Sequence, residues 1–127
     1  MQSTLKTVQA WQDAVNSQDA ETLTELSDAN IEIVGPRGSA YGHEVLRDWL
    51  ARAGLSLTTT RTFVRNDTAV LAQHGVWRSP ENQEVVGEAD VASEFHVKNQ
   101  KVVKVARYDT LDEAFAKSEL GHSDEQK

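Results

Sequence analysis

Residues 95–103 read Phe-His-Val-Lys-Asn-Gln-Lys-Val-Val, and they indicate how the second half of the chain folds. Apolar residues alternate on both sides of Asn99-Gln100, a pair of residue types that favours tight turns. The pattern predicts a long strand over residues 84–98 and an antiparallel partner strand over residues 101–109. This hairpin is the first evidence for an antiparallel sheet.

Two further strands are expected before this hairpin. The hydrophobic period is two over residues 55–64 and again over residues 68–78, and the turn-forming pair Asn66-Asp67 separates them. A shorter alternation at residues 31–34 ends at Gly35-Pro36. The pattern therefore predicts a meander of long strands preceded by one short strand.

Helical periodicity surrounds these strands. Apolar residues recur every three or four positions over residues 3–17, and Asp19 can cap a second, short helix. A third helix is expected over residues 42–53, ended by Gly54, and the Thr-x-x-Glu spacing at residues 110–113 predicts the start of a last one. The element order favours an α+β fold, in which helices packed on a strongly curved mixed or antiparallel sheet form a cone that encloses a pocket.

Composition narrows the function classes. The 127 residues suit a single domain, expected over residues 1–120, followed by a frayed tail at residues 121–127. The absence of cysteine excludes disulfides and thiolate zinc sites, and the histidines lack metal-ligand spacing, so neither a metal nor another cofactor is expected. A net charge of −7 without a basic cluster argues against nucleic acid. Because no signal peptide or membrane-spanning stretch is present, we expect a cytoplasmic protein that does not bind membranes.

Alternation also predicts which strand residues face the helices. Ser93 and Phe95 share the apolar face of one strand, and Arg107 shares that of the last strand, so all three are expected to point inward. Over residues 68–78 neither face is cleanly apolar. We expect a second copy of the chain to cover the outer face, which gives a homodimer through Leu71, Trp77 and Tyr108.

Three motifs together resemble the nuclear transport factor 2-like superfamily, in particular its SnoaL-like polyketide cyclase and ketosteroid isomerase-like branch. The first is a helix that ends in Asn16-Ser-Gln-Asp19, the second is Gly42-His-Glu-Val-Leu-Arg-Asp-Trp49, and the third runs from Phe95 through the hairpin to Asp109. The resemblance covers about residues 4–117. It implies a cone-shaped fold, a homodimer, and a deep pocket whose mouth is lined by the third helix and the loop before it.

Although the chain resembles this branch, it lacks the residues that catalyse the isomerase reaction. That branch uses a tyrosine and a protonated acid as oxyanion donors and an aspartate as the base. The corresponding positions of this chain hold Trp11, Ser93 and Ile33. Isoleucine cannot transfer a proton, so ketosteroid-type isomerisation is not expected. The Asp-Arg-Asp constellation of the epoxide hydrolase branch is also incomplete, because Asp90 is expected to face outward and a second inward aspartate is missing.

His74 is the candidate catalytic residue, because the family register places it in the pocket and histidine titrates near neutrality. The alternative is a core histidine whose ring nitrogens bond to neighbouring groups. Arg107 is expected either to hold an anionic group of a ligand or to pair with Asp109 or a helix carboxylate. The expected ligand-binding set is Trp11, Tyr41, Trp49, Ser93, Phe95 and Arg107.

Two functions remain open from the sequence. The missing family acids favour a non-catalytic dimeric module that binds a small, largely apolar ligand or a protein partner. The alternative is an enzyme of isomerase, cyclase, dehydratase or hydrolase type that acts on a small apolar metabolite, with His74 as its acid or base.

Overall fold

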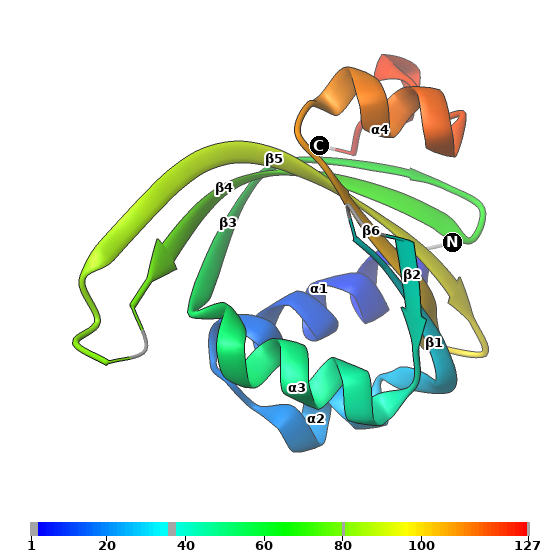
Figure 1. The fold of residues 1–127 in the computed structure, drawn as a ribbon. Coiled ribbons are helices and arrows are strands. Elements are labelled where there is room, and N and C mark those ends of the chain that lie inside the picture. The colour runs from blue at the N-terminus through cyan, green and yellow to red at the C-terminus, as the bar shows by residue number, and fades with distance from the viewer. Residues whose placement is uncertain (1–2, 36–37, 80, 127) are drawn as a thin grey trace.

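A computed structural model describes residues 3–35, 38–79 and 81–126, and it confirms the α+β class (Figure 1). In chain order the elements are α1 (Ser3–Asn16), α2 (Ala20–Glu25), β1 (Ser27–Gly35), β2 (Gly38–Tyr41), α3 (His43–Ala53), β3 (Leu55–Arg65), β4 (Thr68–Arg78), β5 (Val85–Lys98), β6 (Lys101–Tyr108), α4 (Leu111–Ser118) and the 3-10 helix η1 (His122–Asp124). None of the described helices is long and apolar enough to cross a membrane.

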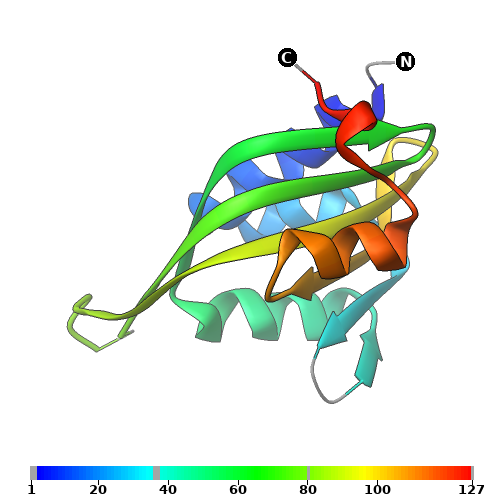
Figure 2. The same cartoon turned by 90° about the horizontal axis from the view of Figure 1, so that it is seen from above.

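The strands form one mixed sheet in the order β2-β1-β6-β5-β4-β3. Only β1 and β6 pair in parallel, with Ile33 opposite Val105, and the other neighbours are antiparallel. The predicted turn joins β5 to β6, and both Asn99 and Gln100 have positive φ, at 52° and 64°. Such a two-residue turn matches the right-handed twist of the strands it connects. The strands arch over α1 and α3, and the β4–β5 hairpin extends beyond the rest of the molecule (Figures 1 and 2).

Both faces of the sheet are covered. On the inner face, α1 and α3 pack on the strands around a core that includes Trp11, Leu46 and Phe95. On the opposite face, α4 covers a second cluster around Phe63 and Val70 (Figure 2). Apolar residues on both sides of β4 are therefore satisfied within one chain.

This arrangement corrects the prediction of a dimer face through Leu71, Trp77 and Tyr108. Leu71 lies in the inner core, and Trp77 packs on the cluster of Leu55, Leu57 and Val91 that Trp49 also contacts. Tyr108 packs on the second cluster, beneath α4. The predicted outward placement was therefore wrong for Leu71 and Trp77, because the strand face that they share packs on the inner side of the sheet, whereas Tyr108 lies on the outer face as predicted. The homodimer itself stays a prediction.

The C-terminal tail is bonded to β3, so the prediction of a frayed tail was wrong for residues 121–126; Lys127 lies outside the described residues. The Gln126 N–H donates to the Thr62 carbonyl oxygen at 2.8 Å. Arg61 and Arg65 form ion pairs with Glu125 and Asp124, at 2.7 and 2.8 Å. The tail thus covers part of the outer edge of the sheet, which would otherwise expose unpaired backbone groups.

A buried carboxylate lies on the outer face of β5. Glu94 is 2% exposed, and it accepts hydrogen bonds from the Tyr108 hydroxyl at 2.9 Å and from His96 Nε2 at 2.6 Å. Burial raises the pKa of Glu94. The hydrogen bonds from His96 and Tyr108 act in the opposite direction and outweigh burial, so the pKa lies below its ordinary value. The folded state therefore favours the ionised carboxylate.

The Glu94 site predicts a specific acid sensitivity. A carboxyl whose pKa is depressed on folding stabilises the protein above its unfolded pKa, near 4.5, and that stability is lost as the pH falls through the folded pKa. We expect Glu94→Gln to reduce the free energy of unfolding by about 1–3 kcal/mol at pH 7 and by less at pH 3. Urea denaturation from pH 3 to pH 7 measures this, with the exposed Glu84→Gln as control. An equal loss at both pH values would contradict it.

Candidate functional site

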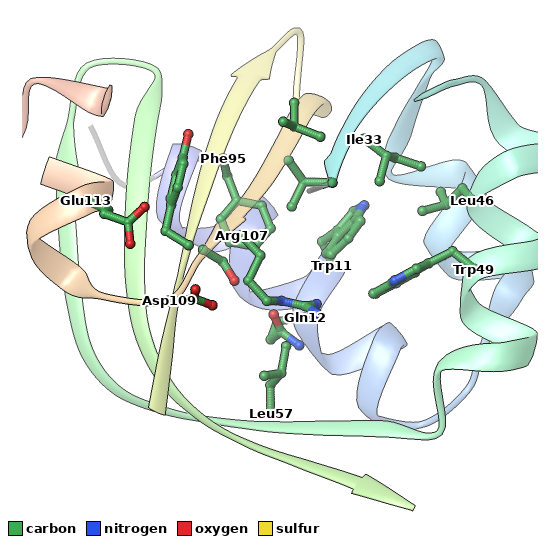
Figure 3. Close-up of a pocket in the computed structure, with 15 residues that line it drawn as sticks. Trp11, Gln12, Ile33, Leu46, Trp49, Leu57, Phe95, Arg107, Asp109 and Glu113 are labelled. Atoms are coloured by element: carbon green, nitrogen blue, oxygen red, sulfur yellow. The ribbon is translucent and has the colours of Figure 1, made fainter. Parts of the chain in front are cut away.

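A pocket of about 520 Å³ lies between the inner face of the sheet and helices α1 and α3 (Figure 3). Its apolar wall includes Trp11, Ile33, Leu46, Trp49, Leu57, Phe95 and Val105. Its polar lining groups include Gln12, Ser93, Arg107, Tyr108, Asp109 and Glu113. The volume falls within the range of small-molecule sites, roughly 300–1,000 Å³, and the mostly apolar wall is typical of them.

Aromatic rings form the inner wall of the pocket. Trp11 stacks on Trp49 with a centroid distance of 6.3 Å, and it meets Phe95 edge to face at 5.4 Å. The Trp11 indole N–H donates to Ser27 Oγ at 2.8 Å. Trp11 therefore supplies an apolar surface to a ligand, and its indole donor is already used inside the protein.

Arg107 points into the pocket from β6, as predicted. Its guanidinium carbon lies 5.8 Å from the centroid of the Trp49 ring. Within the described part of the chain, Arg107 forms no ion pair with Asp109 or with the helix carboxylate Glu113, and its buried Nε has no hydrogen-bond partner. Burial lowers the pKa of Arg107 from its ordinary value, although a guanidinium still remains charged at neutral pH.

A chain of buried side chains crosses the pocket wall from β5 to α1. Ser93 Oγ donates to Gln73 Oε1 at 2.8 Å, and Gln73 Nε2 donates to Gln12 Oε1 at 2.9 Å. Gln12 Nε2 is buried and has no partner among the described residues. Ser93 was predicted from the sequence to face the pocket, whereas Gln12 and Gln73 were not predicted as site residues. Gln12 lies four residues after Val8 and therefore on the same helix face. This spacing is the feature of the sequence that could have predicted its inward position.

His74 does not reach the pocket, so its predicted placement was wrong. It lies on the outer face of β4, where Nδ1 is 2.9 Å from Asp90 and Nε2 is 3.0 Å from Glu88. Its side chain is 41% exposed, and the hydrogen bonds to Asp90 and Glu88 raise its pKa. The cause is the register of β4: Gln73 points inward, and the next residue must then point outward.

Tyr41 also lies away from the pocket, contrary to prediction. It is 61% exposed and does not line the cavity. Residues 38–41 form an edge strand, β2, in which Ala40 is opposite Ile33 and Tyr41 is opposite Glu32. Directly opposed residues share one face of a sheet. Because Ile33 faces the pocket, Ala40 faces the same way and Tyr41 faces outward.

The pocket brings together five of the six predicted ligand-binding residues: Trp11, Trp49, Ser93, Phe95 and Arg107. Ile33 lines the pocket as well, and it is the residue that the resemblance aligns with the base of the isomerase branch. The residues that the structure describes contain no group of three His, Asp or Glu side chains able to hold a metal ion. The arrangement is an apolar cavity with a few polar groups, which include the unsatisfied donors Gln12 Nε2 and Arg107 Nε and the carboxylates of Asp109 and Glu113.

Comparison with known proteins identifies the family. A family model of the SnoaL-like domain matches residues 8–105, which is most of the chain and includes the pocket-lining residues from Trp11 to Val105, whereas Arg107, Tyr108, Asp109 and Glu113 lie beyond the matched range. The chain belongs to the SnoaL-like domain family. This confirms the resemblance to the SnoaL-like branch of the nuclear transport factor 2-like superfamily. No curated protein matches the sequence.

Solved structures share the fold of this SnoaL-like protein. A Mycobacterium tuberculosis protein in complex with estradiol-17beta-hemisuccinate aligns with TM-score 0.74 and 17% identity over 87% of this chain and 95% of that chain. TerC, co-crystallized with polyporic acid, aligns with TM-score 0.73 and 16% identity over 91% and 97%. A nuclear transport factor 2-like protein of unknown function from Cytophaga hutchinsonii gives TM-score 0.72 and 14% identity over 88% and 94%. At these identities the likeness establishes the fold.

Proposed function

We propose that this SnoaL-like protein binds a small, largely apolar molecule in the pocket and does not convert it chemically. The observation that carries the proposal is the cavity of about 520 Å³ with its wall of tryptophan, phenylalanine and aliphatic side chains. Two proteins of the same fold, the Mycobacterium tuberculosis protein and TerC, were crystallised with organic ligands, which supports a ligand-binding role.

The proposal that the protein is not a catalyst rests on the residues of the inner pocket wall. Catalysis of proton transfer needs an acid or base within reach of the substrate. Ile33 has no titratable group, Ser93 is held by Gln73, and His74 lies outside the cavity. The expected homodimer and cytoplasmic location stay predictions, which native mass spectrometry and cell fractionation test.

A second candidate function, an enzyme of isomerase, cyclase, dehydratase or hydrolase type, is favoured by one observation. The carboxylates of Asp109 and Glu113 belong to the pocket lining, as does Arg107. A carboxylate at that position can accept or donate a proton. If a bound metabolite is found to turn over, Asp109→Asn should abolish turnover while binding persists. Unchanged turnover in Asp109→Asn and in Glu113→Gln would show that neither carboxylate is the catalytic group, and a bound metabolite recovered unchanged would remove this candidate.

Filling the cavity tests the binding proposal directly. The neutral fluorescent probe N-phenyl-1-naphthylamine should bind, and its fluorescence should rise in the apolar pocket. Ile33→Trp places a large side chain in the cavity, so we expect its affinity for the probe to fall about tenfold or more, equivalent to roughly 1.4 kcal/mol. Val86→Trp adds the same side chain at a position that is 69% exposed and outside the pocket, and should leave the affinity unchanged. Absence of probe binding to the unmodified protein would contradict the proposal.

A further inference from the structure

We infer that the molecule bound in this pocket carries an anionic oxygen group, and that Arg107 and Gln12 bind that group. The inference rests on the proposed function and adds the chemical class of the ligand: an apolar body with a carboxylate or a comparable oxyanion at one end. Three features of the pocket carry it, namely two unsatisfied donors, the orientation of an amide, and a partly buried positive charge.

The first feature is the location of the unsatisfied polar groups. Among residues 3–35, 38–79 and 81–126, two buried side-chain nitrogen or oxygen atoms lack a hydrogen-bond partner, and they are Gln12 Nε2 and Arg107 Nε. Both residues line the pocket, and Figure 3 shows both side chains reaching into it, one from α1 and one from β6. A buried donor without a partner destabilises the folded protein, because it has lost its hydrogen bonds to water. A ligand that supplies acceptors to both would remove this destabilisation.

The second feature is the orientation of the Gln12 amide. Its Oε1 accepts from Gln73 Nε2 at 2.9 Å, and Gln73 Oε1 in turn accepts from Ser93 Oγ at 2.8 Å. Reversing the Gln12 amide alone would set its NH₂ group against the NH₂ group of Gln73, which is a repulsive contact between donors. With the two amides in this orientation, the unsatisfied N–H belongs to the pocket-lining residue Gln12, and the matching ligand atom is an acceptor.

The third feature is the charge on Arg107. A buried charge is normally paired, because an unpaired one loses the solvation that water would provide. The described acidic residues of the pocket lining, Asp109 and Glu113, form no ion pair with Arg107. The guanidinium instead lies over the face of the Trp49 ring, with its carbon 5.8 Å from the ring centroid. A neutral acceptor would satisfy the Nε–H bond but leave the charge uncompensated, so an anion fits better.

The donors of Arg107 and Gln12 lie beside the aromatic wall, with the Arg107 guanidinium carbon 5.8 Å from the centroid of the Trp49 ring. Trp11, Trp49 and Phe95 provide ring surfaces for the apolar body of the ligand. A guanidinium binds oxyanions with charge-assisted hydrogen bonds, which are about twice as strong as bonds between neutral groups. The pocket should therefore discriminate an acid from its neutral analogue of the same ring structure.

A matched pair of probes tests this. 8-Anilinonaphthalene-1-sulfonate and N-phenyl-1-naphthylamine share one ring system and differ by the sulfonate. We expect the unmodified protein to bind the sulfonate about tenfold or more tightly, as a charged hydrogen bond predicts. Arg107→Met should remove this preference and leave the affinity for the neutral probe nearly unchanged. Arg107→Lys keeps the charge and should retain part of the preference.

Two further variants separate the roles of neighbouring groups. Gln12→Glu has nearly the same shape but replaces the donor by a negative charge, so it should weaken the sulfonate selectively. Asp109→Asn removes a negative charge from the pocket lining and should preserve or strengthen sulfonate binding. Circular dichroism and thermal unfolding establish that each variant is folded. If Arg107→Met does not fold, Gln12→Glu decides the inference by the same comparison of the two probes.

The outcomes are distinguishable. If the neutral probe binds but the sulfonate is not preferred, or if the preference survives in both Arg107→Met and Gln12→Glu, the inference is wrong and the pocket proposal stands. Sulfonate binding that persists in Ile33→Trp would place the probe outside the pocket and would also overturn the inference. If neither probe binds the unmodified protein, the proposed function fails, and the inference fails with it.

Discussion

Replacing Trp11 by alanine is expected to lower the free energy of unfolding by about 3–5 kcal/mol. Trp11 is 2% exposed and lies between the ring of Trp49 and the ring of Phe95. Its removal deletes the largest fully buried side chain of α1 and extends the existing pocket into the core, so the surrounding side chains cannot close the gap without moving. Urea denaturation followed by circular dichroism measures the loss.

Two controls separate packing from hydrogen bonding at this position. Trp11→Phe keeps an aromatic ring but loses the indole N–H that donates to Ser27 Oγ, so a loss of about 1–3 kcal/mol is expected. Trp77→Ala makes the same truncation at a partly buried site and should cost less than Trp11→Ala. If Trp11→Ala destabilised the protein no more than Trp77→Ala, the placement of Trp11 at the centre of the core would be wrong.

Alternation predicted the inner faces of β5 and β6 correctly. Ser93, Phe95 and Arg107 all line the pocket, because each of these strands has one face against α1 and α3 and a different environment on the other face. A one-residue error in register would have reversed every assignment. The pairing register of β5 and β6 shifts between His96 and Val97, so the turn at Asn99-Gln100 does not set it alone, and Ser93 lies opposite Arg107 beyond that shift.

The same reasoning failed on β4 for a physical reason. The cluster around Val70 beneath α4 and the core around Leu71 are both apolar, so alternation along the strand carries little information about direction. Gln73 is polar, so the pattern assigns it to the outer face. In the structure it is buried, and it forms hydrogen bonds with Gln12 and Ser93. His74 was predicted to face the pocket because the family register placed it there and because it shares a strand face with Ala72 and Val76.

The unsatisfied donors could not be found from the sequence. Arg107 was a candidate, but an ion pair with Asp109 was an equal alternative, and only the three-dimensional arrangement shows that this pair is not formed among the described residues. Gln12 gave no signal of its own beyond its helix face. Its free amide donor depends on two contacts between residues far apart in sequence, with Gln73 and, through it, Ser93.

Replacing Gly54 by alanine is expected to destabilise the protein by at least about 2 kcal/mol, although the change adds a single methyl group. Gly54 ends α3 in the left-handed conformation, with φ at 53°. A Cβ atom there would lie 2.2 Å from the carbonyl oxygen of Arg78, whose own N–H donates to the Gly54 oxygen at 2.8 Å. The clash is with backbone, so it can be relieved only if β3 and β4 move relative to α3.

The movement expected from Gly54→Ala also reaches the pocket. Gly54 connects α3, which carries Trp49, to β3, which carries Leu57, and both side chains line the cavity. We therefore expect the variant to bind N-phenyl-1-naphthylamine more weakly as well as to unfold at lower urea concentration. Gly87→Ala is the matched control, because a Cβ at Gly87 meets no heavy atom within 4 Å and its φ is not in the left-handed region. If the two variants were equally stable, the α3–β3 junction would accommodate the added methyl group and the prediction would be wrong. Weaker probe binding in Gly54→Ala but not in Gly87→Ala would show that this junction determines the shape of the pocket.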